Sequence, residues 1–170
     1  IKNTKITYLN KFEPGTESNL SIDLEKKIVE ESLNAKKYDT VLLMNVLEHI
    51  YNFQNCIDIC YFQLKNNGKF YGSTPFYFRV HPSPNDYFRF TDEALKEILS
   101  KSGFKDIAIF PLVGGLFISF YSSFFLIGNK IPFLNNILLP VCFFLDDILS
   151  FFTKSYQKIM PIGYFFKAIK

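Results

Sequence analysis

The chain lacks tryptophan, and it is poor in histidine (two), cysteine (three) and arginine (two) over its 170 residues. His49, His81 and the cysteines show no zinc-like spacing, so the sequence predicts no metal site. Cys56 and Cys60 lie four positions apart in a helical pattern, and with Cys142 they make an odd count. This usage is typical of reduced structural thiols in the cytoplasm, and it excludes a small fold held together by disulfides.

Glycine patterning excludes one class of enzyme. None of the eight glycines forms the Gly-x-Gly-x-x-Gly turn that follows a strand in nicotinamide-binding sheets. The sequence therefore gives no support to a nicotinamide-dependent dehydrogenase.

Long uninterrupted apolar runs are also missing, although residues 107–129 carry no charge. Pro111 and two adjacent glycines divide that run, and residues 116–127 are too few for the ~20 that a spanning helix needs. Asn135, Pro140 and Asp146 interrupt the next apolar stretch, 131–152. We therefore expect two or three hydrophobic helices within residues 112–160, inserted before the last strand.

The net charge of +3 is unevenly distributed. Residues 1–103 hold 13 basic and 13 acidic side chains, whereas residues 104–170 hold 6 and 3. No basic cluster is interleaved with stacking aromatics, so we expect no nucleic-acid partner. An excess of lysine in an apolar segment suits a surface near anionic lipid better.

Hydrophobic residues make up 48% of the chain and charged residues 21%, as in a globular domain with a real core. Strand patterns at 5–9, 38–44, 69–75, 106–110 and 164–169 alternate with helical patterns at 24–33, 55–65 and 92–102. Alternation at these lengths predicts an α/β fold, with a mostly parallel sheet and helices on both faces. We divide the chain into a core (1–111), a hydrophobic helical insertion or cap (112–160) and a final strand (161–170).

Polar side chains follow the apolar strand at 38–44. Asn45, Glu48 and His49 come directly after it. Because open α/β sheets bind ligands beyond the carboxyl ends of their strands, we favour a functional role for this segment over a plain loop start.

The segment from Tyr38 through Leu47-Glu48-His49 resembles the fourth strand and "LEH" element of class I S-adenosylmethionine-dependent methyltransferases of the type 11 and type 23 kind. Residues 64–76 are similar to the same family's helix end, glycine turn and fifth strand. The resemblance implies a Rossmann-like fold and S-adenosylmethionine as cofactor. It implies that Asp23 and Leu24 contact the adenine, with Asn45 and Glu48 completing the cofactor edge.

The stretch 81–91 resembles an "H-x-x-P-x-D-Y-x-R-x-T" loop found over the active-site mouth in one branch of that family. This resemblance implies that Asp86, Tyr87 and Arg89 bind the substrate. Both arginines of the chain, Arg79 and Arg89, fall in this region, as expected where a planar guanidinium binds a carboxylate or phosphate through two hydrogen bonds. Two alternatives stay open: Arg89 binds substrate, or it pairs with Asp86 or Glu48 and pins the loop.

The family's first strand and its Gly-x-Gly-x-Gly turn have no counterpart here. We interpret the sequence as an N-terminally truncated form, in which that piece lies upstream of Ile1. This departure leaves open whether the chain alone is active.

Methyl transfer to a hydroxyl needs alignment and a base, and we predict His81 or His49 for that catalytic role, with His81 preferred. The expected acceptor is a small molecule or a lipid- or sugar-linked one. The expected location is the cytoplasm, and three alternatives stay open for residues 112–160: a lid, a contact with the inner membrane face, or a buried cap. A second hypothesis is a non-catalytic scaffold that binds a partner through a hydrophobic interface.

Overall fold

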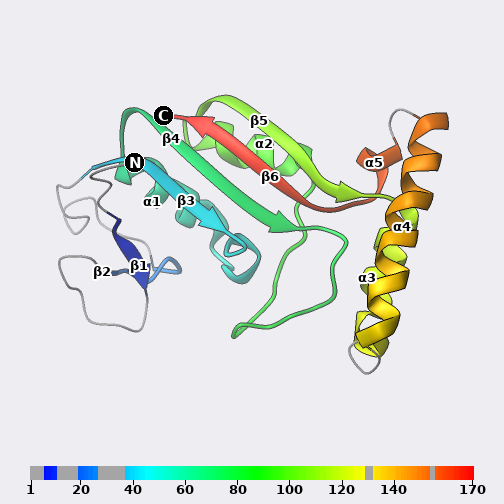
Figure 1. Ribbon diagram of the computed structural model, residues 1–170. Coiled ribbons are helices and arrows are strands. Elements are labelled where there is room, and N and C mark those ends of the chain that lie inside the picture. The colour runs from blue at the N-terminus through cyan, green and yellow to red at the C-terminus, as the bar shows by residue number, and fades with distance from the viewer. Residues whose placement is uncertain (1–5, 11–18, 27–36, 129–131, 154–155) are drawn as a thin grey trace.

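The computed structural model describes residues 6–10, 19–26, 37–128, 132–153 and 156–170. The central sheet contains β3 (Tyr38–Met44), β4 (Leu64–Pro75), β5 (Lys105–Gly114) and β6 (Pro161–Ile169). Two helices, α1 (Phe53–Gln63) and α2 (Asp92–Lys101), alternate with these strands. The predicted α/β fold is confirmed, and Figure 1 shows the sheet crossing the molecule from the N-terminal side to a helical end.

The four strands follow the order β3-β4-β6-β5. β3 and β4 are parallel, whereas β6 runs antiparallel to both β4 and β5. β3, β4 and β5 therefore point the same way, and their carboxyl ends lie together at one end of the sheet (Figure 1). This end, where the strands finish, is the carboxyl edge of the sheet. The last strand returns beside β5 as predicted, and it also separates β5 from β4.

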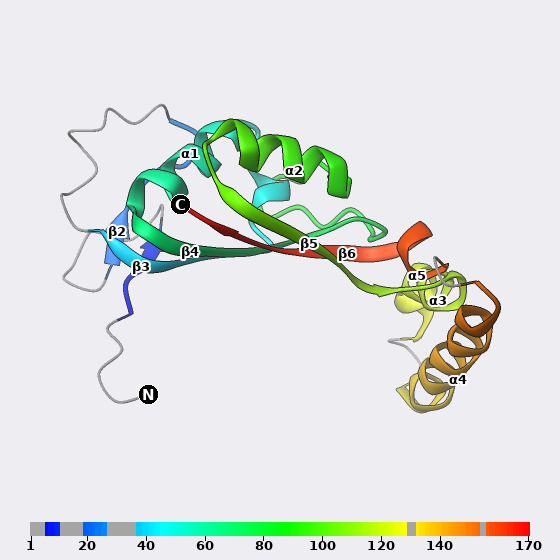
Figure 2. The same ribbon diagram turned by 90° about the horizontal axis from the view of Figure 1, so that it is seen from above.

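The core lies between one face of the sheet and the helices α1 and α2 (Figure 2). Alternate strand residues such as Leu43, Phe70 and Phe166 are buried there. Gly72 is required on this face, because a Cβ at that position would lie 2.2 Å from the Phe166 ring. Burial of the aromatic and aliphatic side chains, each worth about 1.5–3 kcal/mol, holds these layers together.

The opposite face of the sheet carries apolar side chains that are exposed among the described residues, including Leu42, Met44 and Phe110. Both helices that lie on the described sheet pack on the first face (Figure 2). The helix predicted at 24–33 falls largely outside the described residues; Leu24 and Glu25 form a turn. Upstream, β1 (Tyr8–Asn10) and β2 (Asn19–Ser21) form a separate parallel pair, of which only β1 was predicted.

Local signals explain where α1 and α2 begin and end. The Thr91 hydroxyl accepts a hydrogen bond from the Ala94 amide (3.1 Å), which is the predicted N-cap of α2. Gly103, with φ of 97°, closes that helix. After α1, Asn67 adopts a left-handed φ of 62° and turns the chain into the body of β4. The cysteines of α1 are free and buried, and hydrogen bonding to Cys60 together with burial raises the pKa of the Cys56 thiol.

Three hydrophobic helices lie between β5 and β6: α3 (Leu116–Gly128), α4 (Pro132–Phe152) and α5 (Tyr156–Ile159). They extend beyond the edge of the sheet to which β5 points (Figures 1 and 2). The buried carboxylate of Asp146 on α4 accepts the amides of Phe117 and Ile118 (3.0 and 2.8 Å), so it caps α3 from a neighbouring helix. Among the described residues, no helix is both long and apolar enough to cross a membrane.

Two prolines lie inside elements of the structure. Pro111 lies inside β5 rather than ending the strand, because β5 is an edge strand and a missing amide there breaks no ladder bond to a second neighbour. Pro140 lies inside α4, so it interrupts the apolar sequence without ending the helix. Pro140 is exposed in this helix.

Candidate functional site

The segment after β3 places the predicted polar residues at the carboxyl edge of the sheet. Asn45 ends the strand with a left-handed φ of 50°, and it bridges to β4 through hydrogen bonds with Ser73 (Asn45 N to Ser73 O, and Ser73 Oγ to Asn45 Oδ1, both 2.9 Å). A single 3-10 turn, η2 (Leu47–His49), follows immediately. The tight turn buries Leu47 in the core and directs the next side chains toward the loop after β4.

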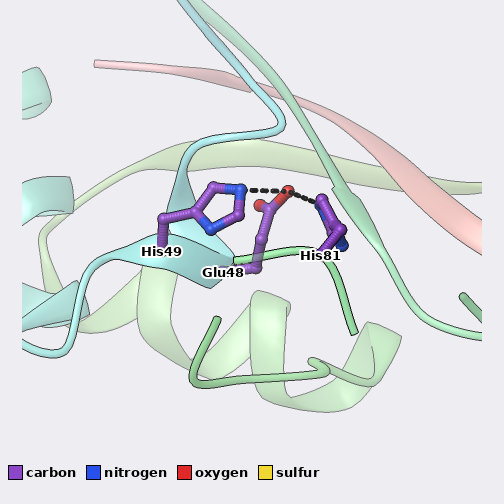
Figure 3. Close-up of side chains that lie close together, drawn as sticks. All are labelled: Glu48, His49 and His81. Carbon is purple, nitrogen blue, oxygen red and sulfur yellow. Dashed lines mark ion pairs between the residues drawn. The ribbon is translucent and has the colours of Figure 1, made fainter. Parts of the chain in front are cut away.

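Glu48, His49 and His81 come together at this edge (Figure 3). The Nε2 atoms of both histidines lie 3.7 Å from Glu48 Oε1, and the two rings pack edge to face with centroids 5.0 Å apart. The Glu48 side chain is fully buried, while those of His49 and His81 are 13% and 28% exposed. Neither carboxylate oxygen of Glu48 makes a hydrogen bond with the described residues. A buried carboxylate without hydrogen bonds is costly, and it marks a site that is prepared for a cation, a proton or a ligand.

Hydrogen bonds fix the orientation of both imidazoles. Nδ1 of His49 lies 2.5 Å from the Asn85 carbonyl oxygen, and Nδ1 of His81 lies 3.1 Å from the Arg79 carbonyl oxygen. A carbonyl oxygen can only accept, so each Nδ1 carries a proton. In the neutral ring the Nε2 lone pair is then directed toward Glu48.

The loop between β4 and α2 is held by an ion pair within it. Arg89 donates to both carboxylate oxygens of Asp86, from Nη1 (2.5 Å) and from Nη2 (2.7 Å). It also donates to the carbonyls of Phe88 (2.8 Å) and Arg79 (3.1 Å). Asp86 is almost fully buried, and the Arg89 guanidinium holds its pKa well below the usual range. Asp86 in turn raises the pKa of Arg89. Of the pairings considered for Arg89, the structure shows the one with Asp86.

This loop is tied to the η2 turn through the main chain. The amides of Tyr87 and Phe88 donate to the Glu48 carbonyl oxygen (2.8 and 3.4 Å). The His81 amide donates to Asp86 (2.9 Å). The structure therefore brings together six of the nine predicted site residues in one network: Glu48, His49, His81, Asp86, Tyr87 and Arg89.

A cleft of about 180 Å³ adjoins this network, and His81 lies on its wall. Its lining is mostly apolar and comes from the ends of β3, β4 and β5 and the start of β6: Asn45, Thr74, Pro75, Phe78, His81, Leu112, Ile162 and Gly163. Asn45 is thus a seventh predicted residue at the site. The Thr74 hydroxyl was not predicted, yet it is buried there and makes no hydrogen bond with the described residues.

The remaining two predicted residues, Asp23 and Leu24, lie in a turn near the start of α1. The Leu24 carbonyl accepts a hydrogen bond from the Asn55 side chain (2.7 Å). The Glu25 carboxylate accepts the amides of Tyr51 (2.7 Å) and Asn52 (3.0 Å), and so it ties this turn to the residues just before α1. The sequence did not predict this contact, because two segments that are distant along the chain leave no local spacing signal.

No family model and no curated protein matches the sequence. Solved structures match its fold. An S-adenosylmethionine-dependent methyltransferase from Archaeoglobus fulgidus aligns at a TM-score of 0.53 and 16% identity, over 90% of this chain and 67% of that one. One from Mesorhizobium loti aligns at 0.53 and 12%, over 93% and 72%. The CurJ carbon methyltransferase aligns at 0.51 and 13%, over 89% of this chain but only 34% of that one.

The chain thus spans part of the length of each of these proteins, in one case about a third. At such identities the likeness concerns the fold alone. It agrees with the resemblance found in the strand and loop motifs of the sequence. This chain has the fold of the class I S-adenosylmethionine-dependent methyltransferases.

Proposed function

We propose that this chain is the acceptor-binding and catalytic part of an enzyme that transfers a methyl group from S-adenosylmethionine to a small acceptor. The observation that carries the proposal is the convergence of Glu48, His49 and His81 beside a cleft at the carboxyl edge of the sheet. Ligands of open α/β sheets bind at this edge. The fold itself is the second support, because the three solved structures described above are methyltransferases.

The reaction is an in-line displacement. A lone pair of the acceptor forms a bond to the methyl carbon, the carbon–sulfur bond breaks, and its electron pair stays on sulfur to give S-adenosylhomocysteine. If the acceptor is a hydroxyl, its proton must leave. Nε2 of His81 is suited to take it, because Nδ1 of that ring is already committed to the Arg79 carbonyl and the ring lies on the cleft wall. The mostly apolar lining would keep water from the sulfonium.

For the cofactor we propose contacts from Asp23 and Leu24 to the adenine, and from Asn45 and Glu48 at the end of β3. The support is their placement. The Asp23 turn is tied to the start of α1 by Glu25 and Asn55, a few residues after the η2 turn. Asn45 lies at the strand end and on the cleft wall.

We further propose that the acceptor is amphipathic, such as a lipid-linked sugar, and that the enzyme works at the inner face of the cytoplasmic membrane. The support is the apolar surface of the helical insertion at the site end of the sheet. On α4, Phe133, Phe144, Phe151 and Phe152 are 64–85% exposed. Exposed apolar surface on this scale marks a lipid or protein contact. The basic excess of residues 104–170 favours anionic lipid.

Binding of S-adenosylhomocysteine tests the cofactor proposal. S-adenosylhomocysteine is titrated by isothermal titration calorimetry into two proteins: the 170-residue chain and the longest protein encoded by its reading frame. We expect Asp23→Asn to weaken binding by about tenfold, the loss of one hydrogen bond to a charged group. Asp39→Asn is the control, since Asp39 lies at the opposite end of β3 and pairs with Lys65 at the surface. Absence of binding to both proteins would favour the non-catalytic scaffold.

Flotation with liposomes tests the membrane proposal separately. We expect the chain to float with vesicles that contain anionic lipid. A Phe151→Ser, Phe152→Ser variant should remain in the pellet fraction, because both rings are exposed and removing them leaves no cavity. Equal flotation of the two proteins, or none of the parent chain, would contradict this part of the proposal.

A further inference from the structure

In the cluster of Glu48, His49 and His81, three atoms that carry lone pairs face one another: Glu48 Oε1 and the Nε2 atoms of the two histidines (Figure 3). Each Nδ1 is protonated, because its partner is a carbonyl oxygen that can only accept. Nε2 of each neutral ring therefore offers a lone pair, and both point at Glu48 Oε1, 3.7 Å away. Three atoms of this kind repel one another unless a positive charge lies among them.

The Glu48 carboxylate strengthens this point. It is completely buried, and neither of its oxygens makes a hydrogen bond with the described residues. A buried ionised carboxylate in that state is strongly destabilising on its own. His81 lies between two carboxylates, with Nε2 3.7 Å from Glu48 Oε1 and Nδ1 3.2 Å from Asp86 Oδ2. A cation held among Glu48, His49 and His81 would give the buried Glu48 carboxylate the partner that it lacks among the described residues.

We propose that Glu48 Oε1, His49 Nε2 and His81 Nε2 bind one divalent transition-metal ion. Two imidazoles and one carboxylate are a ligand set used for zinc and for non-haem iron, and it also suits cobalt and manganese. The three ligand atoms lie within 4.8 Å of one another. Ligand atoms of a tetrahedral zinc ion are about 3.3 Å apart, so each glutamate–histidine separation of 3.7 Å needs to shorten by a few tenths of an ångström. The separation of the two histidine nitrogens, at most 4.8 Å, needs to shorten by up to about 1.5 Å, which requires the two rings to turn toward each other.

The surroundings of both histidines have the form that metal ligands require. A ligating imidazole almost always donates its other ring N–H to a carbonyl or carboxylate, which fixes the tautomer. Here His49 donates to the Asn85 carbonyl, and His81 donates to the Arg79 carbonyl with Asp86 Oδ2 3.2 Å from the same nitrogen. Sequence spacing predicted no metal, because the histidines are supplied by two loops that only the folded chain brings together.

Three protein ligands leave at least one coordination position for water or an acceptor oxygen. His81 is shared between the cluster and the cleft, so that position is reached from the cleft side. If the methyl-transfer proposal holds, coordination would lower the pKa of an acceptor hydroxyl, and the imidazoles would act as ligands rather than as the base. The binding site itself does not depend on that proposal.

Cobalt(II) is the probe, used with tag-free protein that has been dialysed against a chelator. His49 and His81 are the only histidines in the chain, so every imidazole signal reports on this site. We expect one equivalent of cobalt to bind, with visible absorption bands and loss or strong shifts of both histidine ring signals in NMR spectra. Absence of stoichiometric binding, or histidine signals unchanged by the metal, would overturn the proposal.

Variants locate the site. Glu48→Gln keeps the shape of the side chain but removes the anionic ligand. We expect its affinity for cobalt to fall by about 100-fold or more, because loss of a residue that only supports a ligand already lowers metal affinity by about 10- to 100-fold. Glu97→Gln is the control, since Glu97 is an exposed carboxylate on α2. If Glu48→Gln does not fold by circular dichroism, His49→Gln replaces it. Affinity that matches the control in the folded variant would contradict the proposal. No S-adenosylmethionine or acceptor is present, so failure here is distinct from failure of methyl transfer.

Discussion

Replacing Arg89 by lysine separates the two roles that the sequence left open for this residue. The guanidinium makes two charge-assisted hydrogen bonds to Asp86, at 2.5 and 2.7 Å, and two longer hydrogen bonds to the carbonyls of Phe88 (2.8 Å) and Arg79 (3.1 Å). Lysine keeps the charge but cannot form the planar fork. If Arg89 pins the loop, the variant loses stability even when no ligand is present.

The magnitude follows from the bonds that lysine cannot replace. Hydrogen bonds to charged groups contribute about 1.5–3 kcal/mol each, and the ammonium group recovers part of the attraction to Asp86. The Asp86 side chain is 2% exposed, so water does not compensate for the lost fork. We expect a loss of about 3 kcal/mol in the free energy of unfolding, or about 6–12 °C in Tm for a chain of this length.

The loss depends on pH in a definite direction. The pKa of Asp86 is lowered in the folded protein, so its pairing stabilises fully above the unfolded value of about 3.9 and is lost as pH falls toward the folded value. The difference between wild type and Arg89→Lys should therefore be constant near neutrality and shrink below about pH 4.

Urea denaturation followed by circular dichroism measures both effects. Arg79→Lys is the matched control, because Arg79 is the only other arginine, lies in the same loop and is exposed. We expect it to change the free energy of unfolding by less than about 0.5 kcal/mol, as most surface substitutions do. Equal unfolding curves for the two variants would refute the loop-pinning role and leave substrate binding as the reason for an arginine at position 89.

Three further substitutions test the fold around the site. Asp146→Ala removes the cap of α3 and should destabilise by about 2–4 kcal/mol with faster exchange of the α3 amides, whereas Asp147→Ala, an exposed neighbour, should not. Gly72→Ala places a Cβ 2.2 Å from the Phe166 ring; we expect about 1–3 kcal/mol of destabilisation by thermal melting, and an unchanged Tm would contradict this packing. Glu25→Gln should weaken the hydrogen bonds to the Tyr51 and Asn52 amides and lower their protection from exchange by about 1 kcal/mol, and unchanged exchange of both amides would contradict this contact.

Elements governed by local signals could be predicted from the sequence. The run at 38–44 forms β3 with the predicted bounds, because aliphatic and β-branched residues favour the extended backbone. Only Leu43 of this strand is buried among the described residues, so burial on both faces, which a continuous apolar run indicates, is not seen for the described part of the chain. Thr91 caps α2 for an equally local reason. Boundaries that depend on neighbours were less accurate. β5 continues through Pro111 to Gly114, since its place at the sheet edge tolerates a proline and that place is a property of the whole topology.

The sequence could predict which side chains lie near one another, but not their contacts. Position after β3 selected Glu48 and His49, and the scarcity of arginine selected Arg89; their roles stay predictions. The sequence could not show that Glu48 is buried without a hydrogen bond, or that His81 meets it from the loop after β4. Both facts depend on the tertiary path of that loop. The sequence predicted no metal site, whereas a site is proposed from the structure; the difference has the same origin, because ligand spacing is informative only when the ligands share one local element.

The two roles considered for Arg89 are connected by the position of Asp86. This carboxylate accepts hydrogen bonds from the Arg89 guanidinium through both oxygens and from the His81 amide through Oδ2. Arg89 therefore sets the position of His81 without touching Glu48 Oε1 or lining the cleft. An arginine that only pins a loop would still determine the chemistry at the edge of the sheet, since the loop it pins supplies one of the three donor atoms. The stability of the loop and the geometry of the site thus depend on the same two residues, and selection for either one would retain Asp86 and Arg89.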